Sequence, residues 1–162
     1  MLKDLLISKK SSIVNNWIQL IVETYPSKTS SFLKLQKDRF SNPVGYAISS
    51  NAEKIFDEVI KSRNTEIIKN SLTELIKIRA VQDFSPSQAT GFIFFLKKVL
   101  REELEQEKID EEMKTEIIDI ESYIDNVALV AFDLFMDARE KLFKIRVNEI
   151  KSQLAYNKRL TE

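Results

Sequence analysis

Apolar residues recur along this chain at intervals of three and four, the spacing that places them on one face of an α-helix. Residues 2–25 follow this pattern as far as Pro26, which cannot continue a helix. A break near Lys9–Ser11 is compatible with the same pattern. A short second helix is expected after the proline, ending at the charged residues 37–39 and followed by a loop.

Three capping signals mark where later helices begin. Asn42 precedes a proline, and an Asn side chain accepts the unpaired amide hydrogens of a first helical turn in which Pro loses no hydrogen bond. Asn64 or Thr65 opens the next helix, whose apolar line continues to Arg79. Residues 85–88 read Ser-Pro-Ser-Gln, the arrangement of a capping box, and predict the start of a further helix.

The second half of the chain contains the most apolar segment and the longest periodic one. Residues 92–96 are apolar around the whole circumference of a helix, which predicts a central position in the fold. The mostly charged segment 105–116 is expected to form a solvated turn. From Glu116 to about Leu154 the helical period continues without Gly or Pro, which predicts one long final helix.

The composition agrees with an all-α fold, since 162 residues include 2 Gly and 3 Pro, with 43% apolar and 31% charged residues. A chain of this length forms one domain with its own core. We expect a single-domain helical bundle over residues 1–142. Residues 143–162 are expected to extend the last helix as a dimerisation segment or signalling linker.

Missing residue types exclude several chemistries. The chain has no His and no Cys, which excludes histidine-containing triads, histidine-ligated zinc, thiol nucleophiles and disulfides. Two glycines are too few for a phosphate-binding loop. The acidic residues between 102 and 116 lack the His of helical di-iron sites and the turn glycines of calcium loops. We therefore expect no enzymatic activity, no cofactor and no metal.

Charge and hydropathy limit the partners. The formal net charge is zero, so no general attraction to nucleic acid is expected. The longest apolar run, residues 92–96, is too short to cross a membrane. The opening of the chain has no signal-like pattern, which favours a cytoplasmic protein that contacts neither nucleic acid nor membrane.

One charged residue continues an apolar stripe. Arg79 lies one step beyond the apolar line of its helix, and Asp83 shares its face if the helix persists that far. One interpretation, which we favour, is a buried clamp in which Asp83 neutralises Arg79 and Gln82 satisfies backbone groups. The other is a site where the guanidinium binds an anion or carboxylate. The candidate ligand-binding residues are Trp17, Arg79, Gln82, Asp83, Phe92 and Phe95.

The last helix narrows its apolar face toward the C-terminal end. Four residues at spacings of four, three and four form a thin stripe: Phe143, Val147, Ile150 and Leu154. A narrow stripe favours packing against a partner helix, so we expect it to form a homodimer interface. The alternative is that it folds back on its own domain. The same segment has an excess of Lys and Arg, which suits an acidic partner or a solvated face.

Four segments of the chain have distinctive amino-acid sequences: Glu23–Pro26, Gln36–Gly45, Ile78–Ala89 and Arg139–Glu149. They resemble the N-terminal domain family of RsbRD-type RsbT co-antagonists. The resemblance implies a helical, cytoplasmic bacterial module found ahead of output domains in stress-response regulators and sensor kinases. A related RsbR-type sensor domain is a dimeric, globin-like fold without haem, so a globin-like bundle is an expectation here. The phosphate-accepting Ser or Thr residues of such output domains have no counterpart in this chain.

Two hypotheses for the function follow. The first is a non-enzymatic sensor or regulator of signal transduction, a homodimer whose interface responds to a ligand or to a signalling partner of the kinase or co-antagonist type. The second is a small-molecule carrier with an aromatic-lined apolar pocket around Trp17 and residues 92–95. No recognisable arrangement of Asp, Glu, Lys or Tyr side chains favours an enzyme.

Overall fold

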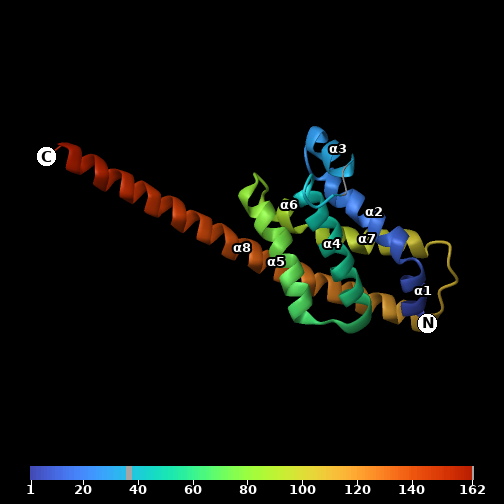
Figure 1. The fold of residues 1–162 in the computed structure, drawn as a ribbon. Coiled ribbons are helices and arrows are strands. Elements are labelled where there is room, and N and C mark those ends of the chain that lie inside the picture. Colours follow the sequence, from blue (N-terminus) through green and yellow to red (C-terminus); the bar gives the residue numbers. More distant parts are fainter. Residues whose placement is uncertain (36–37, 162) are drawn as a thin grey trace.

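A computed structural model of the chain describes residues 1–35 and 38–161. These residues form α-helices and one π-helical turn, and no strand occurs among them. Seven shorter helices gather around the first part of the eighth, which then continues alone away from the bundle (Figure 1). The prediction of an all-α fold with a long C-terminal helix is confirmed. None of the described helices is both long and apolar enough to cross a membrane.

The elements follow one another with short connections. They are α1 (Leu2–Ser8), α2 (Lys10–Glu23), α3 (Ser27–Leu35), α4 (Pro43–Asp57), the π-helical turn η1 (Glu58–Ser62), α5 (Thr65–Val81), α6 (Pro86–Thr90), α7 (Phe92–Leu104) and α8 (Glu111–Thr161). The break expected near residue 9 is present between α1 and α2. The expected end of the second helix at residues 37–39 lies partly outside the described residues.

The predicted capping residues begin the helices where the sequence placed them. The Asn42 side-chain oxygen accepts a hydrogen bond from the amide of Gly45 at 2.8 Å, and Asn64 caps α5 in the same way. Both halves of the capping box between Ser85 and Gln88 are formed. Each cap satisfies amide hydrogens that the first helical turn leaves unpaired.

Two boundaries differ from the prediction. The helix expected from residue 85 is interrupted at Gly91, where a Cβ atom would lie 2.7 Å from the main-chain oxygen of Ser87, so the close approach requires glycine. The last helix begins at Glu111, earlier than expected, because the Asp110 carboxylate accepts from the amide of Met113 at 2.8 Å. An Asp in the charged segment is thus an N-terminal cap.

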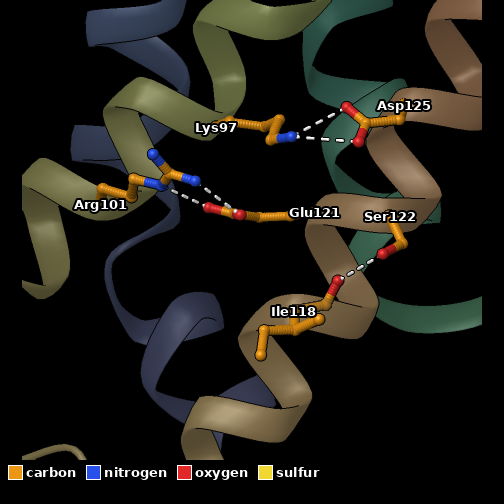
Figure 2. A network of polar contacts seen from close by, with 6 residues as sticks. All are labelled: Lys97, Arg101, Ile118, Glu121, Ser122 and Asp125. Atoms are coloured by element: carbon orange, nitrogen blue, oxygen red, sulfur yellow. Dashed lines mark hydrogen bonds and ion pairs between the residues drawn. The ribbon is translucent and has the colours of Figure 1, made fainter.

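The core lies between α2, α4, α5, α7 and the first half of α8. Its largest buried apolar side chains are Trp17, Phe56, Phe92 and Phe135. Two ion pairs join α7 to α8 on the surface, Lys97 with Asp125 and Arg101 with Glu121 (Figure 2). Each helix advances by four residues in opposite directions between them, so the helices are antiparallel.

The central position predicted for residues 92–96 is only partly correct. Phe92, Ile93 and Leu96 are buried, but Phe94 is 47% exposed. The exposed side of α7 carries Lys97 and Arg101, the residues that pair with α8. A helix at the edge of a bundle keeps one face in water, even where that face is apolar.

Candidate functional site

Arg79, in the last turn of α5, is 2% exposed and is the largest buried polar side chain among the described residues. Its Nε donates to the main-chain oxygen of Ala89 at 3.1 Å. Its Nη2 donates to Thr24 Oγ1 at 2.9 Å and to the main-chain oxygen of Gln88 at 3.3 Å. One guanidinium therefore joins α5, α6 and the end of α2.

Three aromatic rings surround the same guanidinium. Its central carbon lies 5.2 Å from the ring centroid of Tyr25, 4.4 Å from that of Phe84 and 5.0 Å from that of Phe92. The rings of Tyr25 and Phe84 also meet edge to face at 5.3 Å. Faces of aromatic rings attract a cation at these distances. The arrangement is an aromatic cage around a positive charge, which we call the Arg79 cage.

The Arg79 cage holds its charge without a carboxylate from the described residues. Burial lowers the pKa of Arg79, and the neighbouring Tyr25 offsets this only in part. The acceptors Gln88 and Ala89 belong to the end of α6, and Thr24 follows α2. Carbonyl groups at helix C-terminal ends carry partial negative charge, so those of α6 stabilise the cation, and the Thr24 hydroxyl adds a third acceptor.

Gln82 and Asp83, two other residues of the predicted site, lie beyond the end of α5 and not on the same helical face as Arg79. Gln82 adopts extended backbone, with φ of −93° and ψ of 163°, so the helix stops before Asp83. Asp83 is exposed, and the predicted Asp83–Arg79 pair is not formed. Gln82 Oε1 and Arg79 Nη1 are both buried without a hydrogen-bond partner among the described residues. The clamp is therefore built from main-chain oxygens, Thr24 and rings.

Trp17 lies in the core behind the Arg79 cage. It is fully buried, and its Nε1 donates to the main-chain oxygen of Phe92 at 2.8 Å. An indole N–H that is paired with backbone is satisfied within the fold. Trp17 therefore supports Phe92 and does not face an open space.

A surface pocket of about 390 Å³ lies against the Arg79 cage. Its lining residues come from the end of α2, the loop before α6, α6, the junction after it and α7: Thr24, Phe84, Ser87, Gln88, Gly91, Phe92 and Phe95. None of these side chains is charged. Of the residues predicted for ligand binding, this pocket contains Phe92 and Phe95. The contributions of Thr24 and Gln88 were missed because no sequence spacing relates them to Arg79.

Beyond Leu142, α8 leaves the bundle and its side chains are largely solvent-exposed. Phe143 is 67% exposed, Ile150 56% and Leu154 64%, and Val147 is partly exposed. The helix does not return to its own domain, so the fold-back alternative for this stripe is wrong. In the described residues the stripe has no partner within the chain.

The apolar stripe also continues toward the bundle on the same face of α8. Three exposed residues precede it at helical spacing, Leu129 at 64%, Phe132 at 44% and Met136 at 48%. Arg139 and Glu140 interrupt the row before Phe143. We call the row from Leu129 to Leu154 the α8 stripe. Sequence periodicity missed its first part because the buried residues 131 and 135 alternate with it.

Acidic side chains do not gather into a metal site. In the part of the chain that the structure describes, no three Asp or Glu side chains converge as ligands of one ion would. Several acids of α8 instead pair with basic residues, as Glu121 does with Arg101 and Asp125 with Lys97. The two features with unusual chemistry are thus the Arg79 cage with its pocket and the α8 stripe.

Comparison with known proteins identifies one family. The model of the family described as "RsbT co-antagonist protein rsbRD N-terminal domain" matches residues 11–150. Both the Arg79 cage and most of the α8 stripe lie inside the matched residues. No curated protein and no solved structure matches the chain. The globin-like topology implied by the resemblance therefore stays a prediction.

Proposed function

Because the chain belongs to the family of rsbRD N-terminal domains of RsbT co-antagonist proteins, we propose that it is a non-enzymatic, cytoplasmic regulator that signals through α8. The observation that carries this proposal is the α8 stripe. It continues past the bundle on a helix with no other support, and large apolar side chains in such a row favour a partner.

The partner of the stripe is a second copy of the chain. Two parallel α8 helices in register place Val147 and Ile150 against their own equivalents, and the bundles lie side by side at one end. The stripe from Leu129 to Leu154 is about 39 Å long at 1.5 Å per residue. Burying one large apolar side chain contributes about 1.5–3 kcal/mol, so several such residues per copy can hold a dimer.

The proposal divides the chain at Leu142, the last residue that packs against the core. Residues 1–142 form the regulatory bundle, and the part beyond transmits its state to a signalling protein of the kinase or co-antagonist type. A ligand or partner that binds one arrangement of the paired helices more tightly than another shifts the population between them. The bundle then acts by binding and not by catalysis.

Sedimentation equilibrium tests this proposal. The wild-type chain of 18.9 kDa is expected at twice that mass, and the double variant Val147→Glu, Ile150→Glu at the monomer mass with unchanged helical circular dichroism. Asn148→Glu with Ser152→Glu adds the same charge on the other side of the helix, and this control is expected to remain dimeric. A wild-type monomer, or a stripe variant that stays dimeric, contradicts the proposal.

The second candidate function is a small-molecule carrier. The pocket beside Phe92 and Phe95 favours it, because it is lined by rings and uncharged polar groups. A carrier would bind its ligand equally well as a monomer, whereas a regulator couples binding to the α8 pair. Ligand affinity measured for the wild type and for the Val147→Glu, Ile150→Glu variant separates the two functions.

A further inference from the structure

The starting observation is a buried positive charge without an opposite charge. Arg79 is 2% exposed, its three hydrogen-bond acceptors are neutral oxygens, and its Nη1 has no partner among the described residues. Removing a guanidinium from water is costly, and proteins normally place a carboxylate beside it. Helix ends and aromatic rings offset part of this cost, and a bound anion would offset more.

The groups that hold Arg79 also form the wall of the surface pocket. Nη2 donates to Thr24 Oγ1 and to the main-chain oxygen of Gln88, and both residues line the pocket. Phe84 and Phe92 have the same double role, since each ring lies against the guanidinium and lines the pocket. One layer of side chains therefore separates the pocket from the charge.

The polar groups of the wall include donors suited to an oxygen ligand. The Gln88 amide oxygen accepts from the main-chain amide of Ser85 at 3.0 Å, which leaves its NH₂ group as a donor. The Ser87 hydroxyl on the same short helix lies 3.2 Å from the Ser85 hydroxyl, and it is a second donor to the pocket when Ser85 donates in that pair. No acidic side chain lines the pocket, so no carboxylate in its wall repels an anion.

We infer that this pocket binds a small organic monoanion, a carboxylate joined to an apolar body, with its charge balanced by Arg79. The carboxylate lies at the Thr24–Gln88 side, one layer of side chains from the guanidinium, and the body packs on Phe84 and Phe95. A single negative charge matches the single cation, and the thin, low-dielectric layer between them screens their attraction less than water would. The inference rests on the proposed function and adds to it the class of ligand to which the regulator responds.

Trp17 provides a reporter for this site. It is the only tryptophan of the chain, it is fully buried, and its Nε1 donates to the main-chain oxygen of the pocket residue Phe92. Titration with benzoate and with hexanoate is expected to change its fluorescence saturably. Benzamide has nearly the shape of benzoate without its charge, and it is expected to bind at least about tenfold more weakly, a difference of about 1.4 kcal/mol.

Two variants locate the binding. Arg79→Met removes the charge, and Ser87→Phe fills the pocket from an exposed position without touching Arg79. Calorimetric titration is expected to show loss of benzoate binding in both, while Arg101→Met, which removes an exposed Arg on α7, leaves it unchanged. If Arg79→Met does not fold, the Ser87→Phe variant and the comparison of benzoate with benzamide still test whether the pocket binds a carboxylate.

Three outcomes would overturn the inference: neither carboxylate binds below about 10 mM, benzamide binds as tightly as benzoate, or Ser87→Phe leaves benzoate affinity unchanged. Sedimentation of the same samples keeps this test separate from that of the proposed function. If the protein is a dimer that binds no carboxylate, the proposed pocket is wrong and the proposed α8 interface is supported. If the protein is a monomer that binds benzoate at this pocket, the pocket is supported and the proposed α8 interface is wrong.

Discussion

Arg139 on α8 donates a hydrogen bond to the main-chain oxygen of Ala80 on α5, with its Nη1 3.1 Å from that oxygen. Ala80 directly follows Arg79, so a single peptide unit separates this contact from the Arg79 cage. Arg139 also lies where the α8 stripe is interrupted. The contact gives the last turn of α5 an external donor and connects the buried cation to the helix that leaves the bundle.

This connection predicts that Arg79 and Arg139 contribute to stability together. In a double-mutant cycle, Arg79→Met and Arg139→Met are expected to show an interaction free energy of at least about 0.5 kcal/mol, because both act on the same turn of α5. Urea denaturation of the four proteins measures it. As the control, Arg79→Met and Arg101→Met are expected to be additive, since Arg101 pairs with Glu121 elsewhere on α8. Additivity in both cycles would contradict the proposed connection.

Substitutions of Arg79 should separate its packing from its charge. Arg79→Ala is expected to lower the free energy of unfolding by about 2–4 kcal/mol, because it opens a cavity between three rings and removes the donor from Ala89 and Gln88. Arg79→Met keeps most of the volume and removes an uncompensated charge, so a loss of about 1 kcal/mol or less is expected. Equal losses measured by urea denaturation would mean that the charge itself holds the helices together.

The charges beside the α8 stripe predict an unusual salt dependence. In a parallel pair, Arg146 of one copy faces Lys151 of the other, and the two residues repel. Added salt screens such exposed charges, so the dissociation constant of the dimer is expected to fall by roughly threefold to tenfold between low and high ionic strength. Sedimentation equilibrium at several salt concentrations measures this change.

A charge reversal checks the same assignment. Arg146→Glu turns the repulsion into attraction, so this variant is expected to dimerise more tightly at low salt and to weaken as salt is added. Arg159→Glu makes the same change on the opposite side of α8 and is expected to leave the salt dependence close to that of the wild type. A wild-type dimer that weakens with salt would contradict the parallel arrangement.

Local signals in the sequence predicted much of this fold. Asn42, Asn64 and the capping box at Ser85 set helix starts through contacts within three residues, so neighbouring letters suffice to find them. The narrow stripe from Phe143 was also visible, because the helical period alone decides which residues of a continuous helix share a face. Asp110 was readable in the same way, but it stood within a charged run that suggested a turn.

The Arg79 cage could be predicted only in part. The interrupted apolar stripe showed that a charge is buried at residue 79, but its acceptors come from residues 24, 88 and 89, whose approach depends on how three helices pack. Asp83 was the favoured partner because it lies four residues after Arg79, which puts both side chains on one face if the helix continues to residue 83. The helix ends because Gln82 has an extended backbone, and no pattern of residues around position 82 predicts this conformation.

The central claim is that α8 pairs in parallel with a second copy of itself, and cysteine cross-linking tests it most directly. The chain has no native Cys, so a single Asn157→Cys, seven residues beyond Ile150 on the same face, reports on its own equivalent. Under mild oxidation this variant is expected to form a disulfide-linked dimer, whereas Ser152→Cys on the opposite face stays largely monomeric on a non-reducing gel. No cross-link at residue 157, or equal cross-linking at residues 152 and 157, would contradict the parallel α8 pair.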